Sequence, residues 1–177
     1  MEDRTEAFAE RLRKGLLSAL ELYTIVLGDR LGLYRVLADG RARTAPELAD
    51  EMDLAERYVR EWLEQQAAAG ILEVDDVAAA PAERRFALPA EHAATLLDPT
   101  DPAYTASALR SAASIPLELA DVAQVFRTGG GLAWHEVEYA GDEARDANRA
   151  TFERDLAGWI RAVPDVHARL SGGAARV

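Results

Sequence analysis

The sequence predicts a mainly α-helical protein built on a winged helix-turn-helix, with one small β-hairpin and a helical extension after it. Apolar residues recur at three- and four-residue spacing along most of the chain, which is the period of an amphipathic helix. Two of the predicted helices are separated only by the short turn Met52-Asp53-Leu54, as in a helix-turn-helix. Two short strand-like segments follow, joined by a turn region that contains Pro81, and they predict the wing.

The first predicted helix spans residues 5–27, and the break at Gly28-Asp29 separates it from a second, short helix from Arg30 to Leu37. Its carboxy-terminal half is apolar on several sides. A helix of that kind is buried within its own chain or against a partner. The residues that recur at helical spacing are Phe8, Leu12, Leu16, Ala19, Leu20, Tyr23, Val26 and Leu27.

The helix-turn-helix has a clear start. Thr44 can cap a helix, and Glu47 lies three residues later, which is the spacing of a capping box. Pro46 fits the first turn, so the third helix is predicted from Ala45 to Glu51. The remaining elements of this module are a fourth helix over 55–69, which stops at Gly70, strands over 71–74 and 84–88, and a closing helix over 90–97.

The extension is predicted to be helical again. Helices are expected over 104–114 and 116–126, separated at Ile115-Pro116, then over 142–162 and 166–170. The glycines after Thr128 predict a loop, and Ser171-Gly172-Gly173 a linker. The chain therefore divides into an amino-terminal helix with a winged helix (1–98), a helical linker region (99–170), and residues 171–177, where the last four residues look like the opening of a strand.

The charge of the chain limits its partners. The 177 residues are 49% hydrophobic, enough to bury a core, and carry a net charge of -11, which repels phosphate backbones at long range. The absence of cysteine excludes disulfides, thiolate metal sites and a cysteine nucleophile. The charged start Met1-Glu2-Asp3-Arg4 is no signal peptide, and the most apolar stretch, 16–27, is too short to span a bilayer, so we expect a cytoplasmic protein without a membrane partner.

A helix-turn-helix either reads DNA or serves as a packing module. The exposed charges of the fourth helix are three acidic and two basic, and residues 40–90 carry a net charge of -5. A winged helix that docks on DNA presents a basic face. The charges therefore favour the packing interpretation, and we expect no nucleic-acid partner. Arg84 and Arg85 at the wing are the observation in favour of DNA binding. The inner face of the fourth helix is then Val59, Trp62, Leu63, Gln66 and Ala67.

A set of segments spread over nearly the whole chain forms a recognisable pattern: residues 32–34, 44–49, 56–63, 68–72, 86–92, 126–131 with Trp134, Asn148-Arg149, and 163–170. These segments closely resemble the amino-terminal region of class I S-adenosylmethionine-dependent methyltransferases, which carry a winged helix ahead of a Rossmann-like catalytic domain. The Arg57-to-Leu63 block is the most specific part of this resemblance.

The resemblance implies that the parent protein is a methyltransferase that uses S-adenosylmethionine on a small-molecule acceptor. In the family, a segment such as Ala175-Arg176-Val177 opens the first strand of the catalytic domain, and a glycine-rich turn after it holds the cofactor. We therefore expect the Rossmann-like domain to be absent from this chain, which would bind no cofactor and be inactive alone. Gly129 to Gly131 lack the Gly-x-Gly-x-x-Gly spacing and fit a hinge better than a cofactor loop.

The best candidate for an acceptor pocket follows the triple glycine. The resemblance implies that this helical region lies over the catalytic domain, and we expect Trp134, His135, Tyr139, Asn148 and Phe152 to line the pocket. His135 is a candidate to orient or deprotonate an acceptor hydroxyl, because imidazole titrates near neutrality. In the alternative, the two aromatics cover the core and His135 is exposed. The three histidines, at 92, 135 and 167, are too far apart in sequence to predict a metal site.

The first helix suggests an interface. Its apolar carboxy-terminal half offers more apolar surface than one small core needs, and such patches usually mark interfaces. The chain's own later helices are the alternative cover. Related methyltransferases dimerise through amino-terminal helices, so the resemblance favours a homodimer with an interface at Leu16, Leu20, Tyr23 and Leu27.

The sequence thus predicts the dimerisation and acceptor-binding module of a small-molecule methyltransferase. The alternative function is a stand-alone winged-helix transcriptional regulator or a ligand-binding protein. The long stretch from Pro89 to Val177 favours the methyltransferase module, because a minimal DNA-binding winged helix does not need it.

Overall fold

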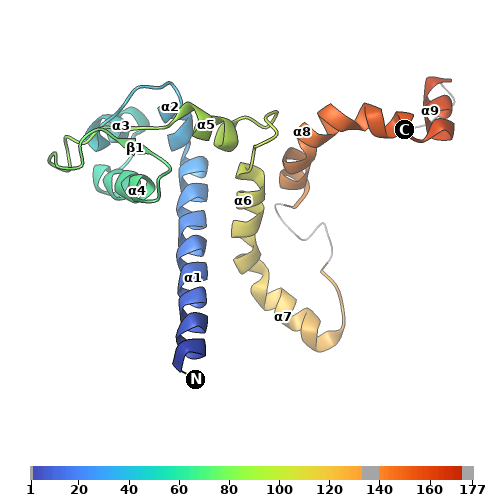
Figure 1. The fold of residues 1–177 in the computed structure, drawn as a ribbon, viewed down its shortest axis with the longest axis horizontal. Coiled ribbons are helices and arrows are strands. Elements are labelled where there is room, and N and C mark those ends of the chain that lie inside the picture. Colours follow the sequence, from blue (N-terminus) through green and yellow to red (C-terminus); the bar gives the residue numbers. More distant parts are fainter. Residues whose placement is uncertain (1, 133–139, 173–177) are drawn as a thin grey trace.

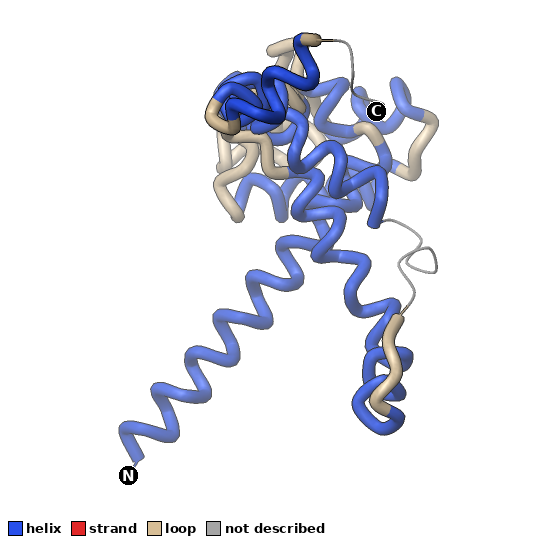
Figure 2. The backbone as a smooth tube through the Cα atoms, turned by 90° about the vertical axis from the view of Figure 1, so that its right-hand side faces the viewer, coloured by secondary structure: helices blue, strands red, loops and turns tan. Residues whose placement is uncertain are grey.

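A computed structural model describes residues 2–132 and 140–172, and it shows a winged-helix head at one end of a long helical rod (Figure 1). The rod is helix α1 (Glu2–Leu31). Helix α6 (Ala106–Ser114) packs beside the part of α1 next to the head, whereas α7 (Leu119–Thr128) diverges from α1 (Figure 2). The other helices are α2 (Leu33–Leu37), α3 (Ala45–Met52), α4 (Glu56–Ala68), α5 (Ala90–Leu97), the short 3-10 helix η1 (Ile115–Glu118), α8 (Ala140–Arg161) and α9 (Pro164–Ser171).

The predicted winged helix-turn-helix is confirmed. Helices α3 and α4 are joined by a turn in which Asp53 adopts the left-handed conformation (φ 53°). Strands β1 (Glu73–Val74) and β2 (Phe86–Ala87) pair antiparallel and form the wing. The capping box is present, because Thr44 Oγ1 accepts from the Glu47 backbone N–H at 3.3 Å and a Glu47 carboxylate oxygen accepts from the Thr44 N–H at 2.9 Å.

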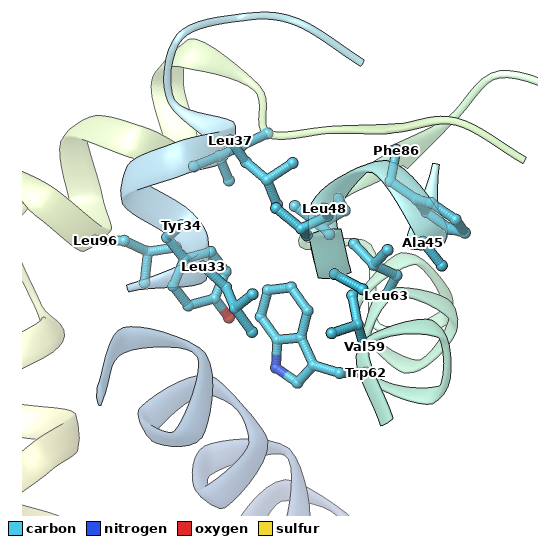
Figure 3. Close-up of a cluster of buried hydrophobic side chains, with 13 residues drawn as sticks. Leu33, Tyr34, Leu37, Ala45, Leu48, Val59, Trp62, Leu63, Phe86 and Leu96 are labelled. Atoms are coloured by element: carbon cyan, nitrogen blue, oxygen red, sulfur yellow. The ribbon is translucent and has the colours of Figure 1, made fainter. Parts of the chain in front are cut away.

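The core of the head gathers between α2, α3, α4 and the wing (Figure 3). Tyr34 and Trp62 meet edge to face, with ring centroids 5.2 Å apart. The inner face of α4 is as predicted: four of its residues are buried and Ala67 is half-buried. The most deeply buried apolar side chains of this core include Leu33, Leu37, Leu48, Leu63 and Phe86.

A polar cluster joins α1 to the head. The Trp62 indole N–H donates to the Thr24 carbonyl at 2.9 Å, and Gln66 Nε2 donates to Thr24 Oγ1 at 3.2 Å. The Tyr34 hydroxyl donates to Gln66 Oε1, and burial raises the pKa of this phenol. Because these groups are buried and satisfy one another, they fix one position of α1 against α4.

The predicted helix break at Gly28-Asp29 is wrong. Helix α1 continues to Leu31, and the chain turns at Gly32, whose φ of 76° suits glycine. Gly28 has a packing role instead. A Cβ there would overlap Cζ2 of Trp62 and lie 2.8 Å from its Cε2, so only glycine lets the indole lie on α1. Glycine as a breaker and glycine as a contact residue look alike in one sequence.

Arg43 ties the segment before α3 to the wing. Its backbone exchanges hydrogen bonds with Phe86 at 2.9 and 2.8 Å, and its guanidinium, only 6% exposed, forms ion pairs of 2.8 Å with Asp39 and with Glu51. The hydrogen bonds from Arg43 hold the pKa of the Asp39 carboxyl well below its usual range. The buried guanidinium therefore has its charge balanced on two sides.

Gly28→Ala is expected to lower the free energy of unfolding by about 1–3 kcal/mol, because the added methyl group forces Trp62 off α1. Gly15→Ala is the matched control on the same helix. No heavy atom lies within 4 Å of a Cβ there, so alanine should raise helix stability by up to about 1 kcal/mol. Urea unfolding of the two variants checks this, and equal effects would contradict the packing role of Gly28.

Asp39→Asn is expected to lower stability at neutral pH, with a difference from the parent protein that shrinks in acid. The pKa of Asp39 is lower in the folded than in the unfolded state. The Asp39 carboxylate therefore stabilises the folded state above about pH 4, and this stabilisation is lost as the pH falls toward the folded pKa. Urea unfolding at a series of pH values measures this. Asp50→Asn, which removes an exposed carboxylate of α3, is the control, and at neutral pH Asp39→Asn should lower stability more than Asp50→Asn does.

Candidate functional site

Helix α1 carries an uncovered apolar face. Every residue from Arg4 to Ser18 except Ala9 is exposed, and Figure 2 shows this half of the helix projecting away from the head. Seven large side chains, each 41–60% exposed, form one broad stripe along its length, which we call the α1 stripe: Phe8, Leu12, Leu16, Leu20, Tyr23, Leu27 and Leu31. All four predicted interface residues belong to it, and in this chain they stay exposed.

Helix α6 packs on a different side of α1. Arg110 forms a 2.9 Å ion pair with Asp29, and its guanidinium also donates to the Tyr104 hydroxyl at 3.2 Å. Both charged side chains are largely buried, and Ala106 and Ser107 of α6 are fully buried. The extension after the wing is thus fastened to the carboxy-terminal part of α1 and does not cover the stripe.

The structure describes two of the five predicted acceptor-binding residues. Trp134, His135 and Tyr139 lie outside the described residues. Asn148 and Phe152 are one turn apart on α8, both exposed to solvent, and the Phe152 ring meets Trp159 edge to face with centroids 6.1 Å apart. Asn148 and Phe152 therefore share a solvent-exposed face of α8.

The basic residues of the winged helix are mostly neutralised within it. Arg84 pairs with Glu64 at 2.7 Å and Arg85 with Glu47 at 2.8 Å, so both wing arginines face carboxylates of the helices. The Thr44 N–H and then Arg85 lower the pKa of Glu47, which stays charged. Arg60 pairs with Glu56 in the same way. The pairing removes the cationic surface that phosphate contacts require, so the two wing arginines, which in the sequence favoured DNA binding, are paired with carboxylates of the head instead.

An apolar groove of about 400 Å³ lies between the end of α1 and α4, and we call it the α1–α4 groove. Its floor holds buried Leu33, Val59 and Trp62, and its rim includes Tyr58, which is 74% exposed. Sequence reasoning missed this groove, because its walls come from separate helices that only the tertiary structure brings together. Its full lining is Leu27, Leu31, Leu33, Leu54, Ala55, Tyr58, Val59 and Trp62.

The histidines show no metal chemistry in the described ranges. His92 Nδ1 lies 2.9 Å from the Ile71 carbonyl, His167 is exposed on α9, and no cluster of three potential ligands occurs in residues 2–132 and 140–172. Over the same ranges, no helix has the length and apolar character needed to cross a membrane.

Comparisons with known proteins agree with this geometry. Residues 18–97 match the family described as the Rv2258c-like winged HTH domain. The structure of the mitomycin 7-O-methyltransferase MmcR matches with a TM-score of 0.61 and 25% identity, over 89% of this chain and 47% of MmcR. The structure of PigF with SAH matches with a TM-score of 0.61 and 18% identity, over 86% of this chain and 47% of PigF, and at that identity it supports the fold alone.

A comparison with curated proteins found no match. The chain spans about half the length of the solved structures that it matches. Residues 18–97 are therefore similar to the Rv2258c-like winged HTH domain, and most of the chain has the fold of about half of MmcR and PigF.

Proposed function

We propose that this chain is the amino-terminal dimerisation and acceptor-binding module of a small-molecule S-adenosylmethionine-dependent methyltransferase. One observation carries the proposal: 89% of the chain, including helices beyond the winged domain, superimposes on about half of a mitomycin 7-O-methyltransferase. The extension after residue 97 is not needed for a winged helix by itself. In a methyltransferase it has a purpose, since it can form a cover over the domain that holds the cofactor.

Each segment of the chain has its own proposed role. Residues 1–98 serve dimerisation, residues 99–170 form the lid or linker region, and residues 171–177 begin the cofactor-binding domain. S-adenosylmethionine is the cofactor of the parent enzyme. The module alone neither binds it nor transfers a methyl group, because the glycine-rich turn that such folds use follows the first strand of the catalytic domain.

The acceptor site involves α8 and the segment before it. Phe152 supplies an apolar wall and Asn148 a polar group, on a face of α8 that solvent reaches. Trp134 and Tyr139 add aromatic surface, and His135 is the candidate to orient or deprotonate an acceptor hydroxyl. Pockets with mostly apolar walls and a few polar groups are typical of small-molecule sites.

The exposed half of α1 supports a homodimer. An isolated helix of this length is marginal in water, and its large apolar side chains add a cost of exposure. A second copy would cover the α1 stripe and stabilise these turns. The alternative function, a stand-alone transcriptional regulator, is disfavoured by the ion pairs of Arg84 and Arg85, which oppose phosphate binding.

The function is tested by comparing this chain with the protein encoded by the continued reading frame. We expect isothermal titration to show SAH binding to the longer protein and none to this chain. In the longer protein, Phe152→Ala should raise the KM of the acceptor at least about tenfold, with the KM of S-adenosylmethionine unchanged, while Val77→Ala in the wing changes neither. A longer protein that binds no SAH would overturn the proposal.

The homodimer is tested by sedimentation velocity at micromolar concentrations. We expect the parent chain to sediment as a dimer, and Leu16→Asp or Leu20→Asp to raise the dissociation constant at least about 100-fold, because a buried, unpaired carboxylate is costly. Val77→Asp, at an exposed wing position, is the control and should remain dimeric. A monomeric parent chain at high micromolar concentration is the contradicting result.

A further inference from the structure

The α1–α4 groove is an apolar site that the acceptor pocket does not include. No charged side chain lines it, and its floor is the buried face of Trp62 between Leu33 and Val59. The groove differs in this from the wing, where Arg84 and Arg85 form ion pairs with carboxylates of α4 and α3. It is shaped to receive apolar side chains.

The groove is continuous with the α1 stripe. Leu27 and Leu31 end the stripe and also form one wall of the groove, while Tyr58 of α4 forms the opposite wall. The two features therefore make a single apolar surface, which runs from Phe8 near one end of α1 to α4 in the head. An occupant that fits this surface has to be long, apolar and about as narrow as one helix.

We propose that the groove receives Phe8 and Leu12 from the α1 helix of a second copy. This inference rests on the proposed homodimer and adds the register and direction of its interface. In a twofold dimer each copy offers the same surface, so the α1 stripe itself has to supply the occupant. The amino-terminal turns of α1 present an exposed aromatic ring and a leucine one turn later.

Antiparallel pairing follows from the shape of the molecule. In a parallel pair the two heads would meet side by side, and because each head is wider than α1 they would hold the stripes apart (Figure 1). In an antiparallel pair the heads lie at opposite ends. The stripe is centred close to Leu20, so this arrangement sets Phe8 against Leu31 and Leu12 against Leu27 of the other copy.

The exposed area agrees with a second copy as the occupant. Covering a half-exposed large side chain removes roughly 100 Å² from water. The seven residues of the stripe together with Tyr58 thus offer roughly 800 Å² per copy, which is about what each partner contributes to a standard interface. A small apolar molecule would fill about 400 Å³ at one end and leave the remaining turns of the stripe in water.

Cross-linking tests the register, since the chain has no cysteine of its own. Full-length single variants Phe8→Cys and Leu31→Cys are treated, alone and mixed, with a short bis-maleimide reagent. We expect a covalent dimer only in the mixture, because each residue lies far from its own symmetry mate in an antiparallel pair. Leu20→Cys should cross-link alone, and Phe8→Cys mixed with Val77→Cys should not.

The outcomes separate this inference from the dimer itself. If the parent chain sediments as a dimer but Phe8→Cys or Leu31→Cys cross-links alone, or the mixture does not cross-link, the register is wrong and the homodimer stands. If the parent chain is a monomer, both fail. Tyr58→Asp provides a second measurement, with a dissociation constant raised at least about tenfold and an unchanged circular dichroism spectrum.

An apolar fluorescent dye distinguishes a small-molecule occupant. If the second copy fills the groove, anilinonaphthalene sulfonate should bind poorly at concentrations where the chain is dimeric, and binding should rise on dilution, with the fluorescence of the bound dye as the readout. Stoichiometric binding to the dimer that Tyr58→Asp abolishes would assign the groove to a small apolar ligand and overturn the inference.

Discussion

The contact between α1 and α4 through Trp62 is the constraint on which the rest of the structure depends. The indole lies on the helix because Gly28 has no side chain, and its N–H is satisfied by the Thr24 carbonyl. Gln66 reaches the Thr24 hydroxyl and also accepts from Tyr34, so a buried polar network accompanies the apolar contact. Each of these groups would be costly to leave unpaired, and the network therefore admits one placement of α1.

Because α1 has one position against α4, it is also determined which of its sides other helices cover and which side stays exposed. The Asp29–Arg110 ion pair fastens α6 to one side of the helix, and α4 occupies another. What is left is a broad apolar stripe that continues into the α1–α4 groove. A rigid rod with one uncovered apolar side is well suited to a symmetric partner, since both copies present it in the same orientation and lose little conformational entropy on pairing.

The electrostatics of the head agree with a winged helix used for packing. Winged helices that bind DNA present cationic side chains to phosphates, whereas in this head Arg84 pairs with Glu64 and Arg85 with Glu47. These pairs are partly exposed and contribute little stability each, but they remove positive charge from the wing. The same arrangement of helices and wing occurs in about half of the structure of a mitomycin 7-O-methyltransferase.

Much of the fold was determined by the sequence itself, because local signals agreed with one another. The capping box at Thr44 and Glu47, the helical periods and the turn at Asp53 predicted the winged helix-turn-helix, and all three are local properties of the backbone and its neighbours. The inner face of α4 could be predicted for the same reason, since a period of 3.6 residues fixes which side chains share a side.

Only the tertiary structure decided the rest. Gly28 predicted a helix break, yet it is a contact point for an indole 34 positions later, and no local pattern distinguishes the two roles. The pairing of the wing arginines and the groove beside Tyr58 likewise depend on residues brought together from separate helices. Periodicity shows that a side chain belongs to an apolar face, whereas only the packing of whole elements decides whether that face is covered by the same chain or left open for a partner.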